Sequence, residues 1–222
     1  MSKLVWDQIG EKFYETGIEQ VALFPYADGG YNKGVAWNGI TALNVTPSGA
    51  EPTALYANNS KYLTLMSAEE VGGTVEAYTY PVEWKKCMGF AEIVKGAYVG
   101  QQARSVFGLA GKSIIGNDTE LNKHGYKLHL LWGALASPSE EGHSTVNESP
   151  EATTFSWEFS TTPVQMTGFD PTSYICIEST NVDAAKLKEL EAIIYGTEEA
   201  EARLPLPSEV ATILGWTAPA EE

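Results

Sequence analysis

The feature that most constrains the fold is a strict two-residue alternation of aromatic and polar side chains. The run FSWEFSTTPV, residues 155–164, places an aromatic residue at every second position from Phe155 to Phe159. Successive side chains of a β-strand point to opposite faces, so this spacing predicts a strand with one apolar and one polar face. The apolar face is expected in the core. What the other face meets, with its single carboxylate at Glu158, is the question that the sequence raises.

Most of the first 182 residues continue in the same way, as short alternating runs separated by turn residues. GTVEAYTY, YKLHLLWGAL and SYICIEST are examples of the expected strands. One exception is PVEWKKCMG, where a proline starts, and a glycine ends, a short amphipathic helix over about 82–89. We therefore expect a mainly β domain over residues 1–182, an antiparallel β-sandwich or part-barrel with a short flanking helix.

Residues 183–222 have a different pattern, which predicts an acidic helical segment. Asp183 is placed to cap AAKLKELEAIIY, whose Leu187, Leu190 and Ile194 form an apolar stripe at helical spacing. An acidic link, GTEEAEARLPLP, leads to a second short helix in SEVATILGW.

The segment at about 44–66 is longer than the interior of a domain requires. Its prolines, its glycine and the pair Asn58-Asn59 indicate a long excursion, interpreted as a hairpin tipped by ANNS. Long ordered loops are often contact surfaces, although a mobile surface loop fits the sequence equally well.

The net charge of −15 is concentrated at the C-terminal end. Residues 1–137 carry a net −2, whereas residues 138–222 hold 16 acids against 3 bases, a net −13. Ordinary binding to nucleic acid is disfavoured, because affinity for phosphates depends on lysine and arginine. Solubility of an acidic surface is the simpler alternative explanation.

Motifs of catalysis or of metal binding are not found. GLAGKS, residues 108–113, has two residues between its glycines where a phosphate-binding loop needs four, and we interpret it as a turn that connects strands. His124, His129 and His143 lack the spacing of metal ligands and are interpreted as surface residues. We therefore expect no catalytic residue, no metal and no cofactor.

The remaining composition favours an intracellular product. Cys87 and Cys176 have no nearby cysteine partner and are expected to be reduced, buried thiols. The first residues contain no apolar run long enough for a signal peptide, and no apolar stretch of 18 residues occurs in the chain. We expect no membrane partner.

Several long runs resemble the major tail protein, or tail tube protein, of long-tailed, non-contractile bacteriophages and prophages. The runs are FYETG, GVAWNGITALNVTPSGAEPTALYANNSKYLTL, GGTVEAYTYPVEW, IGNDTELNKHGYKLHLLWGALASPSEE and SWEFSTTPV. They cover roughly residues 6–180 in order, and LPLPSEV is similar to a frequent C-terminal ending of that family. Several long matches in series are far more specific than any short motif.

The resemblance implies a structural virion protein. Subunits of this family form a β-sandwich with a flanking helix, associate with themselves into hexameric rings and stack into a tube around the tape-measure protein. Four strands of each subunit usually join those of its neighbours into a barrel around the lumen. Tail terminator and distal tail proteins are the other expected partners, and DNA passes through without specific binding. The expected location is the virion tail, assembled in the cytoplasm of the host bacterium.

The resemblance also suggests which residues carry these contacts. A long loop of the family typically reaches the adjacent ring, and here the candidates are Pro47, Glu51, Pro52, Tyr56, Asn58, Asn59 and Tyr62. An acidic lumen would repel DNA, which carries one negative charge per about 1.7 Å of axis, and keep it moving. We therefore predict that Glu158 and Glu178 face the lumen.

Two other functions remain as alternatives. A β-sandwich binding module for carbohydrate or a host surface would expose its aromatics as a platform, whereas the alternation predicts that most are buried. An acidic β-rich enzyme would need a site that the sequence does not present.

Overall fold

A computed structural model describes residues 3–143, 145 and 152–217. The last five residues of the expected helical segment, 218–222, lie outside the described part. Over the described residues the chain is mainly β, with a large antiparallel sheet, a few short helices and no closed barrel. No helix in these ranges is long and apolar enough to span a membrane.

Eight strands make up the large sheet, in the order β2-β1-β9-β10-β11-β6-β3, with β14 also paired to β10. Their bounds are β1 (Phe13–Pro25), β2 (Val35–Ala36), β3 (Ile40–Gly49), β6 (Glu69–Ala77), β9 (Phe107–Asn117), β10 (Leu121–Ala136), β11 (Phe155–Thr161) and β14 (Tyr174–Glu178). Every pairing is antiparallel.

The sheet branches in the middle of β10, at Gly133. Before this residue β10 pairs with β14, with Leu131 opposite Tyr174, and after it β10 pairs with β11, with Ala134 opposite Thr161. Gly133 has φ +64°, and a Cβ here would collide with the carbonyl of Thr162. Glycine is therefore required at the point where one strand turns from one partner to the other.

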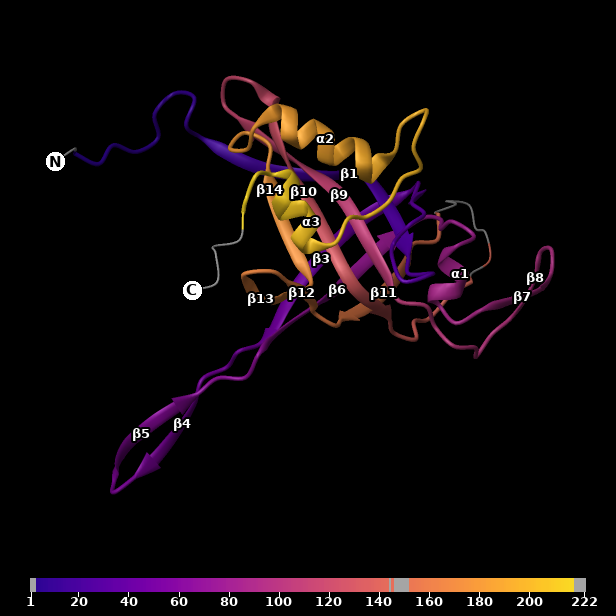
Figure 1. The fold of residues 1–222 in the computed structure, drawn as a ribbon, viewed down its shortest axis with the longest axis horizontal. Helices are drawn as coiled ribbons and strands as arrows, with labels where there is room; N and C mark the ends of the chain where they lie inside the picture. Colours follow the sequence, from indigo (N-terminus) through magenta and orange to yellow (C-terminus); the bar gives the residue numbers. More distant parts are fainter. Residues whose placement is uncertain (1–2, 144, 146–151, 218–222) are drawn as a thin grey trace.

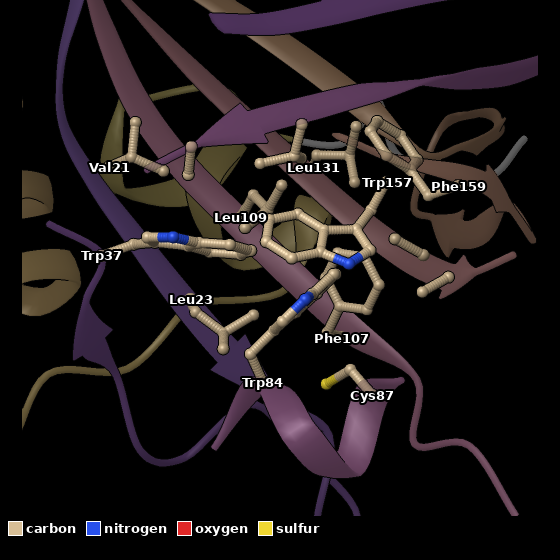
Figure 2. Close-up of a cluster of buried hydrophobic side chains, with 14 residues drawn as sticks. Val21, Leu23, Trp37, Trp84, Cys87, Phe107, Leu109, Leu131, Trp157 and Phe159 are labelled. Atoms are coloured by element: carbon tan, nitrogen blue, oxygen red, sulfur yellow. The ribbon is translucent and has the colours of Figure 1, made fainter. Parts of the chain in front are cut away.

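The first core lies between the two parts of the sheet that this branch creates. Buried side chains from β1, β9 and β10 meet those of β6 and β11 and of the short helix α1 (Trp84–Cys87). Figure 2 shows Trp37, Trp84 and Trp157 converging at its centre. The alternation at 155–160 is confirmed, because Trp157 and Phe159 are buried here while Ser156, Glu158 and Ser160 are exposed.

The second core lies on the opposite face of β1, β9, β10 and β14, under the helices α2 (Ala184–Tyr195) and α3 (Pro207–Ile213) (Figure 1). Leu187, Leu190 and Ile194 of α2 are buried against the sheet, as their spacing predicted. Asp183 caps this helix, since its carboxylate accepts hydrogen bonds from the backbone N–H groups of Ala185 and Lys186.

Because these two cores cover both of its faces, β9 is buried along most of its length, and this corrects one prediction. GLAGKS lies inside β9, so the interpretation of residues 108–113 as a connecting turn is wrong. A strand that is covered on both faces loses the alternation by which strands are recognised.

Three two-stranded ribbons complete the fold. They are β4 (Thr53–Ala57) with β5 (Ser60–Leu65), β7 (Ala91–Val94) with β8 (Ala97–Val99), and β12 (Val164–Met166) with β13 (Phe169–Thr172). The first projects far from the body, and the second stands with α1 at the other end of the long axis (Figure 1).

Candidate functional site

The projecting ribbon, residues 50–68, is called the arm below and is the most unusual feature of the molecule. Its base is the pairing of β3 with β6, which extends from Ile40 opposite Ala77 to Gly49 opposite Glu69, with one register shift between Ile40 and Ala42. β4 and β5 then continue the ribbon after an elbow, where the backbone N–H of Ala50 donates to Ser67 Oγ at 3.1 Å. The expected hairpin is confirmed, and strands rather than an irregular loop form it.

The tip of the arm is a tight turn at Asn58-Asn59. Both asparagines have positive φ, +49° and +63°, the conformation that two-residue hairpin turns with the correct twist require. Asparagine tolerates this region better than most residues, because its short polar side chain can bond locally. The expectation of a hairpin tipped by ANNS is thus confirmed in position and in type.

The arm exposes almost all of its surface, including large apolar side chains. Every residue of β5 is exposed. The exposed apolar and aromatic residues of the arm are Leu55, Tyr56, Tyr62, Leu63, Leu65 and Met66, with Tyr56 and Tyr62 at 73% and 72%. Two-stranded ribbons are marginally stable alone in water, and exposed apolar patches of this kind are typical of interaction sites.

All seven residues predicted for a contact with an adjacent ring lie on the arm or its base, and all are exposed. Pro47 belongs to β3 and stands opposite Val71 of β6. Glu51 and Pro52 lie at the elbow, Asn58 and Asn59 form the tip, and Tyr56 and Tyr62 flank it. The structure therefore gathers these residues on one projection, while their role in an assembly stays a prediction.

Glu158 lies on a polar face formed by the outer side of β11, β6 and β3. It stands opposite Thr74 of β6, which stands opposite Asn44 of β3, and Asn44 Nδ2 donates to Thr74 Oγ1 at 3.0 Å. Glu76 shares this side of the sheet, since it alternates with the buried Val75 and Ala77. Sequence reasoning missed Glu76, although the alternation in TVEAY was a signal for it.

Glu178 is on a different surface from Glu158. It stands opposite Lys127 of β10. Lys127 shares one face of β10 with His129 and Leu131, and this face is directed toward the first core. The Glu178 carboxylate accepts a 2.6 Å hydrogen bond from Asn181 and lies 3.7 Å from Lys127 Nζ. The structure does not bring the two predicted lumen acids together, and only Glu158 belongs to the polar face.

A chain of hydrogen bonds crosses four strands on the face that carries Glu178. Tyr174 OH is 2.6 Å from His129 Nδ1, and His129 Nε2 is 2.8 Å from Ser113 Oγ. Ser113 Oγ donates to Glu15 Oε1 at 2.7 Å, and Lys127 Nζ donates to Glu15 Oε2 at 2.7 Å. The four strands β14, β10, β9 and β1 are thereby connected side chain to side chain.

The direction of these bonds decides what Ser113 and His129 can do. Because the Ser113 hydroxyl gives its proton to Glu15, His129 Nε2 must carry the proton between the two residues, and Nδ1 accepts from Tyr174. A histidine in this tautomer has no lone pair facing the serine, so it cannot take its proton as a general base. With the protons assigned in this way, the hydrogen bonds crosslink the four strands.

Charges within this network are set by burial and by Lys127. Desolvation lowers the pKa of His129, which keeps the imidazole neutral. The hydrogen bond from Lys127 lowers the pKa of Glu15, and that from Ser113 adds to the effect. The expectation that His129 is a surface residue is wrong, since only 16% of its side chain is exposed.

The two cysteines differ in environment. Cys87 is buried in the first core, where desolvation raises the pKa of its thiol to about 12. Cys176 is exposed, which contradicts its predicted burial. It stands opposite His129 on the part of the sheet that β3 and β6 leave uncovered. Both thiols are free, and no cluster of metal-ligating residues occurs in the described ranges.

Comparison with protein-family models finds no match, and comparison with curated proteins finds none either.

Proposed function

We propose that the chain is a structural subunit that assembles with itself into stacked, hexameric rings, forming a phage tail tube through which DNA is delivered. The tube would be built on an antiparallel β-sandwich of the tail-tube type, to which the resemblance in the sequence points. The observation that carries the proposal is the arm, a ribbon that projects from the body of the fold and exposes an apolar surface (Figure 1). A projection of this kind acquires a stable environment when another copy covers it.

The layered arrangement supports a tube with an outer and an inner side. α2 and α3 cover one side of the fold, and the polar face of β11, β6 and β3 lies beyond the first core. The charged members of that face are acids, Glu158, Glu76 and, nearer the arm, Glu70, among uncharged polar residues. A lumen lined by this face would repel the phosphates of any DNA that passes within about 8 Å, the Debye length at physiological ionic strength.

Partners follow from the same proposal. The subunit would bind other copies of itself, the tape-measure protein inside the tube, and the tail terminator and distal tail proteins at its two ends. The proposal gives the chain no catalytic role and no cofactor, and it places the protein in the virion tail.

Electron microscopy of the purified protein at increasing concentration tests the proposal. Rings or tubes with a central channel are expected, alone or after addition of the tape-measure protein as nucleator. Replacing Glu158 and Glu76 by lysine should leave the tube intact and slow the passage of DNA. Single particles at every concentration, with and without the tape-measure protein, would contradict the proposal.

A carbohydrate-binding or host-binding module is the second candidate, favoured by one observation. Tyr56 and Tyr62 are exposed on the arm, and exposed aromatic rings can stack on sugars. A glycan array separates the two functions, because the binding module requires saturable binding that Tyr62→Ala removes. The tube subunit requires none.

A further inference from the structure

A second exposed apolar surface lies at the end of the molecule opposite to the arm. α1 and the ribbon β7–β8 stand opposite the arm along the long axis of the fold (Figure 1). Subunits that stack head to tail use two different surfaces, which must complement one another. The end that carries α1 is therefore where a complement to the arm has to be sought.

This end exposes apolar side chains in a cluster. Val82 precedes α1, and Ile93, Val94 and Val99 belong to β7 and β8, with exposed fractions of 41–69%. Beside them is a groove of about 460 Å³, whose lining includes Val35, Val82 and Phe90 together with three lysines and three acids, Lys33, Lys85, Lys86, Asp28, Glu83 and Glu92. We call the exposed residues Lys33, Val82, Lys86, Ile93, Val94, Lys95 and Val99 the receiver surface.

The receiver surface is built on a firm base. α1 buries Trp84 and Cys87 in the first core, so the helix is anchored from below. Lys85 Nζ lies 3.5 Å from the ring centroid of Tyr98, which attaches the β7–β8 ribbon to the helix through a cation–π contact. A surface fixed in this way can accept a partner without a large entropic cost.

Charge distinguishes the two ends. Residues 40–77, the arm with its base strands, hold four acids and one lysine, a net −3. Residues 78–106, which contain α1, β7 and β8, hold four bases and two acids, a net +2, although the whole chain is at −15. Lys33, Lys86 and Lys95 are exposed and enter no ion pair within the described residues.

We infer that the arm of one copy docks on the receiver surface of a second copy, in a contact that joins successive rings. The inference rests on the proposed function and names the surface that the arm meets. Tyr62 and Met66, which have the same parity along the ribbon, supply the apolar area, which covers Val82 and Ile93. Glu51, Glu69 and Glu70 come opposite the unpaired lysines, so the contact is steered by charge and completed by burial.

Charge reversal tests the inference. The receiver variant carries Lys33→Glu, Lys86→Glu and Lys95→Glu, and the arm variant carries Glu51→Lys, Glu69→Lys and Glu70→Lys. Each alone should raise the concentration needed for ring stacking roughly tenfold or more, because like charges then face each other. All six substitutions in one chain should restore stacking, since complementarity returns with opposite sign. Light scattering and negative-stain microscopy measure the stacking.

A control variant separates a local effect from net charge. Lys12→Glu, Lys123→Glu and Lys188→Glu change the net charge as much as the receiver variant does, at other exposed positions. This control is expected to stack like the unmodified protein. If it loses stacking equally, or if the receiver variant stacks normally, the inference is wrong.

The rings themselves distinguish the inference from the proposed function. The receiver variant should still form single rings with a central channel, because only the contact between rings is altered. Unmodified protein that never forms rings would refute the proposed function, and the inference with it. The inference alone would be overturned if the unmodified protein stacks and the variant with all six substitutions does not.

Discussion

The arm and the helix α2 are both attached to the large sheet, and they differ in how their apolar residues are used. α2 buries Leu187, Leu190 and Ile194 against the sheet, so its apolar stripe is satisfied within one subunit. β5 exposes every residue, and the aromatic side chains of the arm, Tyr56 and Tyr62, are largely exposed. The comparison teaches that the apolar residues of one appendage are satisfied within the subunit, whereas those of the other stay exposed and would be covered only in the proposed assembly.

The largest expected effect comes from the first core. Trp84 is fully buried and lies 4.6 Å from Trp37 and 4.8 Å from Phe107 between ring centroids. Trp84→Ala should lower the free energy of unfolding by about 3–5 kcal/mol, because it removes a large buried ring and leaves a cavity. Denaturant unfolding measures the change. Trp6→Ala is the control, since Trp6 is 74% exposed, and equal losses in the two variants would contradict this account of the core.

A smaller effect is expected where α2 meets the sheet. Lys112 is 8% exposed, and its Nζ lies 2.8 Å from Glu191 Oε1, which also accepts a hydrogen bond from Tyr126 OH. Lys112→Met leaves this carboxylate without its cation and should cost about 1–3 kcal/mol of unfolding free energy. Amide hydrogen exchange should become faster along α2.

The exposed Lys188 on the same helix provides the control for this pair. Lys188→Met should change stability by less than about 0.5 kcal/mol. If the amide hydrogens of α2 exchanged at the same rate in the two variants, the packing of α2 on the sheet would not depend on Lys112.

Acid should weaken the network around His129. The pKa of His129 in the folded protein is lowered from 6.5. Below about pH 6.5 this imidazole is therefore protonated more in the unfolded chain than in the folded chain. Stability therefore falls as the pH drops through this range. Glu15 has a pKa lowered from 4.5, and its contribution is lost as the pH falls below that value.

Thermal unfolding between pH 7.5 and 4 measures this dependence. His129→Gln should remove the part of the decrease that begins near pH 6.5 and keep the part that Glu15 causes. An unchanged pH profile in this variant would exclude His129 as the group responsible.

The smallest effect on the free subunit is expected in the arm. Tyr62→Ala should change the free energy of unfolding by less than about 0.5 kcal/mol, because the ring is 72% exposed and packs on no core. The same variant should reduce ring stacking. A large loss of unfolding free energy in the monomer would show that Tyr62 packs against other residues of its own subunit.

Part of the fold could be predicted from local patterns. The alternation at 155–160, the helix at α1, the cap at Asp183 and the turn at Asn58-Asn59 each depend on neighbouring residues, and the structure agrees with all four. β9 was misread in part, because it is covered on both faces and a central strand of this kind shows no alternation.

The side-chain network could not be predicted in the same way. Glu15, Ser113, His129 and Tyr174 come from four different strands, and the registers of β1, β9, β10 and β14 bring them together. The exposure of Cys176 has the same origin, since it depends on where β3 and β6 leave the sheet uncovered. Contacts set by strand register leave no signal within a short stretch of sequence.

The proline at position 47 determines where β3 can accept a further strand. Val71 directs its carbonyl to Thr161 of β11, so the opposite residue, Pro47, turns its backbone nitrogen away from β6. That nitrogen has no hydrogen to donate, and a strand approaching from outside finds a gap in the ladder there. A strand that paired along the edge of β3 would therefore be interrupted at Pro47, which works against edge-to-edge aggregation at the base of the arm.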